Sequence, residues 1–396
     1  MEHKLKANIR KFYLFNILSS FVLYYAIDKI LMASRGLSVT DIVLIEISYT
    51  ITRLVLEVPS GALADRWSRK YVLALNMVFF IVTTFLWAVA PNLGIFVLGS
   101  LIASIHSALK SGTDTSFLYD TLKQLDRFDS YTKTQGNVIF WENLLSILAG
   151  IGGGMLADAF GLAVPLWATL PFSLGAVIVA LTFTEPQIHR TTGEVSFWKH
   201  IRETGKFILS RASLASLIIF SVTMEISILL IDEYSQLYFV GVGIPLLALG
   251  YLSGVSHGLA AIGGKFAYML GGFSRKKVFG FAAVLSAAGF IVVGLTNSLW
   301  GVPFAFLPFI AYDFAYPLVL NDLHNELPSE QRATGESFLA LMQSLMYGLV
   351  AFGFGRVADN ISIGTAYLFV GMLVAVYFVF FLFSFRDKKA GVDLAV

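Results

Sequence analysis

Long apolar stretches, separated by short polar breaks, fill nearly the whole chain. About twelve of them reach the roughly 20 residues that a helix needs to cross the hydrocarbon core of a bilayer. A soluble core could not bury this much apolar surface, because 57% of the 396 residues are hydrophobic and only 14% are charged, against about 25% charged in ordinary soluble domains. The sequence therefore predicts an all-α membrane protein in a lipid bilayer. The expected spans are 11–33, 41–63, 72–90, 94–119, 134–158, 162–184, 208–239, 245–270, 278–296, 299–325, 333–357 and 362–385.

The composition also argues against several other classes of protein. The net charge is only +2, which speaks against a nucleic-acid partner. The absence of cysteine excludes disulfides and thiolate metal sites, and we expect neither a metal nor a cofactor. The segment "GVSHG" (254–258) matches the G-x-S-x-G pattern of a nucleophile, but it lies in mid-span, whereas that pattern needs a strand–turn–helix elbow. We therefore expect that the chain is not an enzyme.

The longest polar break divides the chain near its middle. We expect an N-terminal bundle over 1–184, a central cytoplasmic loop over 185–206, and a C-terminal bundle over 207–396. Within the loop, "FWKHIRETGKFI" predicts an amphipathic helix at the membrane surface, with a plain solvated linker as the alternative. Placing the N-terminus inside puts almost all loop Lys and Arg on the inner side. This predicts a multi-pass protein of the cell membrane, with a retained first span and both termini cytoplasmic.

Two sequence echoes indicate an internal repeat. "GGGMLADAFG" (152–161) resembles "GFGRVADNIS" (353–362), and "WSRK" (67–70) resembles "FSRKK" (273–277). Both echoes join the same two parts of the chain. They predict two six-helix halves related by a parallel repeat, a construction that many secondary transporters share.

The stretch "GALADRWSRK" (61–70) resembles the signature of the major facilitator superfamily, which lies between the second and third spans. Ser68 departs from that signature, where a second glycine is usual. The twelve spans, the central loop and the echoed motif extend the resemblance over the whole chain. It implies twelve helices in two bundles and transport of a small molecule by alternating access, with one chain as the working unit. The matching positions are Gly61, Leu63, Asp65, Arg66, Arg69 and Lys70.

The resemblance also implies roles for the motif. Gly61 would allow close packing of span two, and Asp65 would cap the cytoplasmic N-terminus of span eleven, where the helix dipole favours an anion. Arg69 would pair with Asp120 at the foot of span four. Together these contacts would latch the cytoplasmic side shut; a simple loop clasp without a gating role is the alternative.

Span five carries a glycine stripe that partly resembles the motif of the antiporter branch. Gly150 and Gly154 form G-x-x-x-G, but the branch's proline is missing. Ordinary close packing of helices explains the stripe equally well.

Ionisable residues lie inside several predicted spans, where each costs at least ~2.5 kcal/mol without a partner, water or a function. The resemblance implies that spans one, four, seven and ten line the transport cavity, and all four carry such residues. Those expected to couple transport to protons are Asp114, Glu142, Glu225, Asp313 and His106. Those expected to line the substrate cavity are Asp28, Lys110, Tyr312 and Tyr316.

Span four has the densest group. His106, Lys110 and Asp114 follow i, i+4, i+8 and are expected to stack along one helical face, with Lys110 and Asp114 paired across a turn. Such a column could relay a proton or bind a charged group of a substrate. A self-neutralised structural pair with a hydrogen-bonded histidine is the alternative.

We expect the first of two transport functions, and the second is the alternative. The first is proton-coupled efflux of drugs or amphiphilic compounds, which acids and aromatic residues would favour through cation–π attraction. The second is proton-coupled uptake of a polar nutrient such as a sugar, peptide or organic acid, for which Lys110 and His106 could bind an anionic group.

Overall fold

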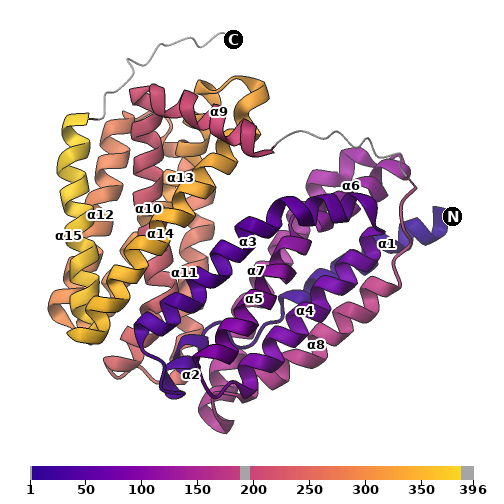
Figure 1. Cartoon of the computed structure of the whole chain (residues 1–396), viewed down its shortest axis with the longest axis horizontal. Coiled ribbons are helices and arrows are strands. Elements are labelled where there is room, and N and C mark those ends of the chain that lie inside the picture. Colours follow the sequence, from indigo (N-terminus) through magenta and orange to yellow (C-terminus); the bar gives the residue numbers. More distant parts are fainter. Residues whose placement is uncertain (1, 188–196, 385–396) are drawn as a thin grey trace. The chain divides into compact units, whose positions relative to one another are not determined.

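The computed structural model describes the backbone of residues 2–187 and 197–384. The side chains of residues 57–66, 197–200, 330, 333 and 384 lie outside the described part. Throughout the described ranges the chain forms helices joined by turns, and no strand (Figure 1). The all-α prediction is therefore confirmed.

Ten helical segments in the described part are long and apolar enough to cross a bilayer, and they coincide with the last ten expected spans. The expected span 41–63 falls within a single long helix, α3. The expected span 11–33 is instead interrupted, because α1 ends at Ser20 and α2 starts at Asp28. Twelve full spans therefore remain a prediction.

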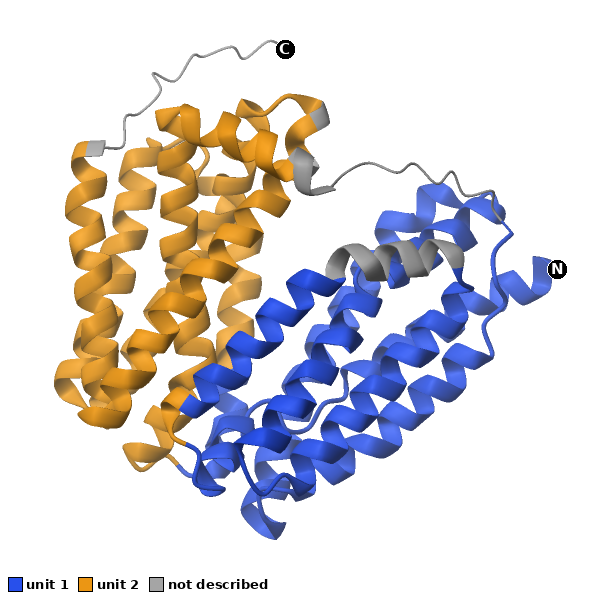
Figure 2. Cartoon of the chain, in the orientation of Figure 1, with its two compact units in different colours: residues 1–37, 41–195, 245–254 blue, residues 38–40, 196–244, 255–396 orange. Residues whose placement is uncertain are grey.

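The chain divides into two compact units (Figure 2). Unit 1 comprises residues 1–37, 41–195 and 245–254, and unit 2 comprises 38–40, 196–244 and 255–396. The helices that begin before residue 185 are α1 (Glu2–Ser20), α2 (Asp28–Ser34), α3 (Val39–Arg66), α4 (Arg69–Val89), α5 (Leu93–Lys110), α6 (Thr113–Gln124), α7 (Tyr131–Phe160) and α8 (Val164–Leu181). Those after it are α9 (Phe197–Ser210), α10 (Ala212–Gly241), α11 (Leu246–Phe266), α12 (Arg275–Thr296), α13 (Leu307–Glu326), α14 (Arg332–Asn360) and α15 (Ile363–Ser384).

Small residues set how closely helices approach within each unit. In unit 1, α4 packs against α5 and α8, and α1 packs against α7 and α8. Gly99 of α5 lies under the indole of Trp87, where an added Cβ would stand 2.4 Å from Nε1. In unit 2, α12 packs against α13 and α15, and Gly294 lies so close to Gly364 that an added Cβ would be 2.7 Å from its carbonyl oxygen. Such contacts are typical of helix pairs in membranes.

The amphipathic helix predicted in the central region is present as α9. Part of its apolar side packs against α14 and α10. Gly205 accommodates the ring of Phe338 from α14, and Ile201 and Ile208 are buried. The charged side chains Arg202 and Lys206 remain exposed. The helix α9 is therefore part of unit 2, and its expected position at the membrane surface stays a prediction.

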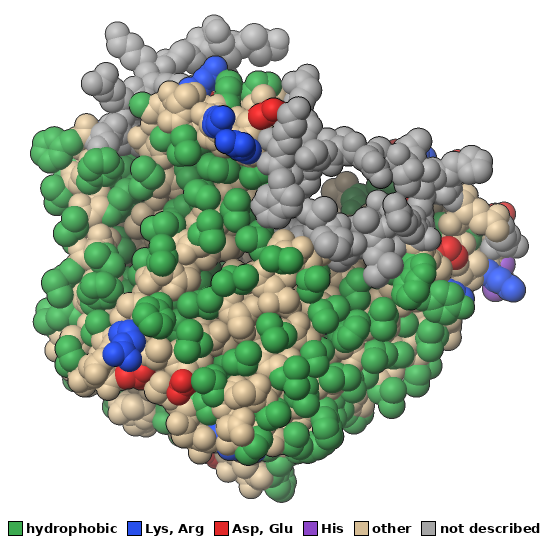
Figure 3. Space-filling model, viewed as in Figure 1, with side chains coloured by type: hydrophobic (Ala, Val, Ile, Leu, Met, Phe, Trp, Pro, Cys, Tyr) green, Lys and Arg blue, Asp and Glu red, His purple; other side chains and the backbone are tan. Residues whose placement is uncertain are grey.

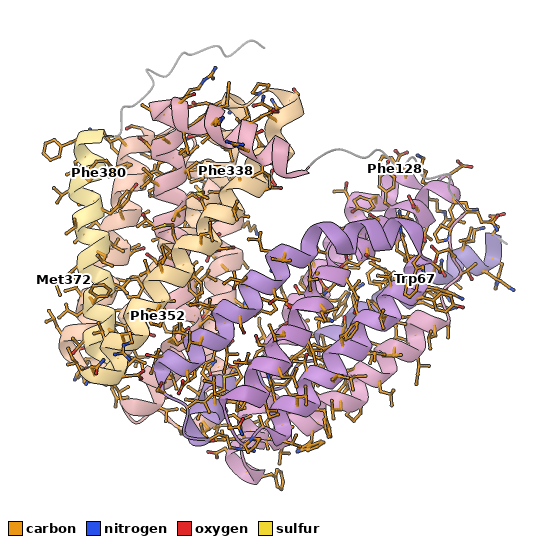
Figure 4. The ribbon with its side chains drawn as sticks, in the orientation of Figure 1. Trp67, Phe128, Phe338, Phe352, Met372 and Phe380 are labelled. Carbon is orange, nitrogen blue, oxygen red and sulfur yellow. The ribbon has the colours of Figure 1, made fainter. Side chains whose placement is uncertain are left out.

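The outward faces of the helices are apolar. Figure 3 shows hydrophobic side chains over most of the visible face, with charged side chains confined to small groups. On α15, Met372 and Phe380 project outward (Figure 4) and are 51% and 55% exposed. Contiguous apolar surface of this extent is unfavourable in water and suits lipid contact.

Candidate functional site

The first expected span is interrupted by residues 21–27, and unit 1 is built to hold that irregular segment. Backbone without helical hydrogen bonds is tolerated at membrane depth only where protein or a cavity surrounds it. The Leu23 N–H donates to Thr169 Oγ1 at 3.0 Å. On the other side, Gly153 of α7 touches the same residue, since an added Cβ would stand 1.6 Å from the Leu23 carbonyl oxygen. Sequence analysis missed this interruption, because the interrupted residues 21–27, "FVLYYAI", are themselves apolar.

A cavity of about 240 Å³ opens beside the interruption, inside unit 1. Its walls come from the end of α1 and the irregular segment, from α4, from α5 and from α7. The wall carries three ionisable side chains expected from the sequence, His106, Lys110 and Glu142, together with serine hydroxyls and aromatic rings. The remaining lining residues are Phe15, Ser19, Ser20, Val22, Tyr25, Met77, Phe80 and Ser146.

His106 is held in one orientation on the cavity wall. Its Nδ1 lies 2.8 Å from the backbone carbonyl oxygen of Asn76, and its ring packs on Phe80 with centroids 5.0 Å apart. A carbonyl can only accept, so Nδ1 carries the hydrogen and the neutral ring keeps Nε2 as an acceptor. His106 therefore offers an acceptor, not a donor, to whatever reaches that nitrogen.

The expected column of charges on span four is interrupted as well. The helix α5 ends at Lys110, and Gly112 adopts φ +73° before α6 begins at Thr113. Asp114 therefore belongs to a new helix, where its Oδ1 accepts the Thr115 N–H at 2.7 Å. The predicted continuous face of His106, Lys110 and Asp114 was wrong, because a left-handed glycine ends the first helix.

Lys110 is left with no direct partner. Within the described part of the chain, its ammonium has no ion pair within 4 Å and no hydrogen bond. Glu142 shares the cavity wall and also has no direct partner there. The charges of Lys110 and of the carboxylates of Asp114 and Glu142 still influence one another at longer range.

A second polar group lies within unit 2, on helices α10, α13 and α14. The Tyr312 hydroxyl donates to Glu225 Oε2 at 2.6 Å, and Gln343 Nε2 donates to the same oxygen at 3.4 Å and to Ser221 Oγ at 3.2 Å. The rings of Tyr312 and Tyr316 stack with centroids 4.9 Å apart. Gln343 was missed by sequence analysis, since a neutral residue in a helix gives no distinctive signal.

Asp313 lies next to this group on α13. Its Oδ2 is buried and has no hydrogen-bond partner among the described residues. Gly263 of α11 packs against it so closely that an added Cβ would stand 2.5 Å from the Asp313 Cβ. Another acid, Asp232 of α10, acts on it electrostatically. A buried carboxylate in such surroundings is uncommon in spans and marks a functional candidate.

Asp28 lies at the start of α2 and is buried. The Lys29 ammonium binds Asp28 Oδ2 at 2.9 Å and Glu46 Oε1 of α3 at 2.7 Å. Sequence analysis placed Asp28 among the cavity residues, yet it is absent from the lining of the cavity described above and joins a buried ion network. The ion pair between Lys29 and Glu46 was not predicted, because the sequence does not show which residues of spans one and two lie close together.

The motif between α3 and α4 is described only in part. The surroundings of Gly61 and the side chains of Asp65 and Arg66 lie outside the described part. Arg69 pairs with Asp120, the partner implied by the family resemblance, and donates to the Ser116 carbonyl at 2.8 Å.

Glu185, just after α8, caps the start of α4 and was not expected. Its carboxylate accepts the N–H groups of Arg69 at 2.9 Å and Lys70 at 3.1 Å, and the Ser68 hydroxyl at 2.7 Å. Ser68 replaces the glycine of the family signature and thus gains a hydrogen bond. The Lys70 amine lies over the Tyr71 ring, 4.7 Å from its centroid.

The glycine stripe of span five packs against the start of α11. An added Cβ on Gly250 would lie 2.2 Å from the Gly150 carbonyl oxygen, and one on Gly154 would lie 2.9 Å from that of Leu246. Close helix packing accounts for the stripe in unit 1. The "GVSHG" segment lies within the helix α11 and so lacks the strand–turn–helix geometry of a nucleophile. Among the described residues, no cluster of three or more His, Asp or Glu could hold a metal.

These features define a helical membrane protein with polar groups set inside apolar bundles, as expected of a transporter. Residues 12–351 match the family model described as Major Facilitator Superfamily, and the chain belongs to that family. The N-terminal signature, the helices and the two echoes agree with this membership. No curated protein shows a significant sequence match to the chain.

Solved structures share the fold at low sequence identity. A nucleoside transporter, NupG, is 17% identical with a TM-score of 0.74, covering 98% of this chain and 99% of that one. A D-xylose–proton symporter is 15% identical with a TM-score of 0.70, covering 98% and 99%. A POT family transporter in complex with a thioalcohol-conjugated peptide is 12% identical with a TM-score of 0.72, covering 95% and 96%. The chain thus has the fold of alternating-access transporters.

Proposed function

We propose that the protein is a proton-coupled transporter of a small polar solute, and that the cavity of unit 1 is part of its substrate site. The observation that carries this proposal is the cavity lining, which combines an ammonium, a carboxylate, an imidazole and several hydroxyls. An amphiphilic drug gains most from apolar and aromatic walls, whereas this lining suits a solute that hydrogen-bonds.

The similar structures support a polar solute by analogy. Their names refer to a nucleoside, to D-xylose with a proton, and to a peptide conjugate. The three solutes differ, so the analogy supports the class and leaves the substrate open. Of the two functions that the sequence left open, we therefore favour transport of a polar nutrient over efflux of drugs.

Proton coupling is assigned to buried carboxylates. Glu142 lies on the cavity wall, Glu225 is held by Tyr312 and Gln343, and Asp313 has a buried oxygen without a partner among the described residues. Asp114 is a weaker candidate, because the start of α6 already binds its carboxylate. His106 is assigned a binding role, since one nitrogen is fixed by Asn76.

The experiment is counterflow in proteoliposomes that contain the purified chain. Sugars, nucleosides, amino acids, hydroxy acids and cationic dyes are compared, with and without an imposed pH difference. We expect exchange of polar solutes, accumulation only with the pH difference, and loss of accumulation in Glu142→Gln. Exchange of dyes alone, or accumulation independent of pH, contradicts the proposal.

One observation favours efflux of organic cations as a second candidate. In unit 2 the stacked Tyr312 and Tyr316 rings adjoin the carboxylates of Glu225 and Asp313. Rings and anions together attract a cation. If the stacked tyrosines bind the cation, Tyr316→Ala abolishes exchange of cationic dyes. The control variant Tyr377→Ala, which changes a tyrosine on α15, leaves the exchange intact.

We also propose that the pair Arg69–Asp120, with Glu185, belongs to a latch on the cytoplasmic side. Glu185 accepts the first two N–H groups of α4, and the ion pair of Arg69 connects α4 to α6. Cytoplasmic termini, the cell membrane and a monomeric working unit are proposed on the same grounds as in the sequence analysis.

A further inference from the structure

We infer that the transported solute is a small carboxylate that also carries a hydroxyl or ammonium group, and that Lys110 binds its carboxylate while Glu142 takes up a proton. This inference rests on the proposed function and names the chemical class of its substrate.

The first step is the state of Lys110. Its ammonium lies on the wall of the cavity and has no hydrogen bond or ion pair among the described residues. A charged group at membrane depth is costly unless paired or solvated, and buried ammonium groups are normally satisfied by a partner. The geometry of the cavity leaves the ammonium open to an anion that enters from solution.

The second step excludes the two nearby acids as direct partners. Asp114 lies beyond the break at Gly112, and its Oδ1 accepts the Thr115 N–H at 2.7 Å. Glu142 is on α7 and makes no ion pair with Lys110 within 4 Å. The ammonium is therefore near negative charge without being neutralised by contact, which suits reversible binding of a mobile carboxylate.

The third step concerns the rest of the solute. His106 Nε2 is an acceptor, because Nδ1 donates to the Asn76 carbonyl. An acceptor of this kind binds a hydroxyl or an ammonium and does not bind a carboxylate. The hydroxyls of Ser20 and Ser146 line the same cavity and make no hydrogen bond within the described ranges. A hydroxy acid or an amino acid presents the matching groups.

The cavity has room for such a solute. Its volume is about 240 Å³, and a three- to six-carbon acid fits this space. The volume is therefore compatible with the class that the donor–acceptor pattern selects.

The last step links the solute to a proton. Glu142 and the Lys110 ammonium share the cavity wall and make no direct contact among the described residues. A bound carboxylate neutralises Lys110 and places a further negative charge beside Glu142, so Glu142 then binds a proton. The charged and titratable groups that face Glu142 are Lys110, Asp114, His106 and Tyr25. One solute and one proton bind together, so the transported set is electroneutral for a hydroxy acid and carries one positive charge for a zwitterionic amino acid.

The test observes Lys110 directly and does not depend on transport. The lysines of the full chain in nanodiscs are ¹³C-dimethylated, which preserves their charge, and the Lys110 signal is assigned by its absence in Lys110→Arg. Lactate, glycerate and alanine are added, and lactamide and glycerol serve as neutral probes. We expect a saturable shift of the Lys110 signal with the acids alone. In Lys110→Gln, which lacks this signal, the proton uptake described below should need at least tenfold more acid.

Proton uptake is measured in the same samples with a pH indicator in weak buffer. We expect close to one proton per bound anion in the wild type and none in Glu142→Gln, which should still bind the anion. A Lys110 signal that no acid shifts, or that lactamide shifts equally, overturns the inference. A Lys110 shift without any transport contradicts the proposed function alone, whereas transport of neutral solutes with a silent Lys110 contradicts this inference alone.

Discussion

The guanidinium of Arg275 binds the carboxylate of Asp322 through two nitrogens, with Nε–Oδ2 at 2.7 Å and Nη2–Oδ1 at 3.2 Å. Arg275 is the first residue of α12, and Asp322 lies near the end of α13. In unit 1, Arg69 is the first residue of α4 and pairs with Asp120 near the end of α6. The echoed "SRK" stretch therefore carries the same ion pair in each unit, which gives the sequence repeat a structural meaning.

We expect Asp322→Asn to lower the stability of the protein by about 1.5–3 kcal/mol, the usual value for a hydrogen bond to a charged group. Both side chains are about one-fifth exposed, at 22% and 23%, so solvent screens the pair only in part. The measurement is thermal unfolding in detergent, followed by tryptophan fluorescence. Glu203→Gln, an exposed acid on α9, should leave the midpoint unchanged, and equal shifts in the two variants contradict the prediction.

Gly153→Ala should prevent proper folding of unit 1. The new methyl group would stand 1.6 Å from the Leu23 carbonyl oxygen, which is backbone and cannot rotate away. The cost should exceed the ~1–3 kcal/mol that is typical of overpacking. Size-exclusion chromatography of the expressed protein gives the readout.

The matched control is Gly136→Ala in the same helix, where nothing lies within 4 Å of an added Cβ. This change should be neutral or stabilising by up to about 1 kcal/mol through helix propensity. A monodisperse, fully stable Gly153→Ala protein would show that α7 does not approach the interrupted segment as described.

Much of the fold was readable from the sequence, because transmembrane length and apolar composition identify helices without any knowledge of their partners. The last ten expected spans coincide with helices. The interruption at 21–27 was not predicted, because the segment "FVLYYAI" is as apolar as a span and its turn depends on Thr169 and Gly153 elsewhere in the chain. The break at Gly112 had a weak sequence signal, the small residues of "KSGT". The prediction relied instead on the i, i+4, i+8 spacing of the ionisable residues.

The candidate site was predictable as a set of residues but not as a geometry. His106, Lys110 and Glu142 were singled out because ionisable groups are rare in spans, and they do line one cavity. Their hydrogen bonds depend on contacts between helices far apart in sequence. For that reason Gln343 beside Glu225, and Glu185 at the start of α4, could not be assigned from the chain alone.

Glu225→Gln tests Glu225 as an alternative to Glu142 as carrier of the coupling proton, and it should separate coupling from substrate exchange if Glu225 carries that proton. The glutamine keeps the size of the side chain and can still accept the hydrogen bond of Tyr312, but it cannot carry a proton. We expect accumulation driven by a pH difference to fall at least tenfold, while counterflow exchange at equal pH is retained within about threefold.

Tyr312→Phe supplies the comparison, because it removes the 2.6 Å hydrogen bond and leaves the titratable carboxyl group. We expect this variant to keep pH-driven accumulation but with an altered pH profile. If Glu225→Gln accumulates solute as the wild type does, Glu225 carries no coupling proton and Asp313 becomes the remaining candidate in unit 2.

Gly263→Ala tests the role of Asp313 without changing its charge. The added methyl group would stand 2.5 Å from the Asp313 Cβ and 3.0 Å from its backbone carbon, so α13 or the carboxylate must move. Gly264 is the neighbouring residue on α11, and an added Cβ there meets nothing within 4 Å. If Asp313 acts through its position, Gly263→Ala reduces pH-driven transport at least tenfold in protein that still elutes as a single species, while Gly264→Ala transports normally. Equal activity of the two variants would show that the placement of Asp313 against α11 has no part in coupling. If the Gly263→Ala protein fails to fold, Asp313→Asn replaces it in the test, because this variant keeps the packing and removes the titratable group.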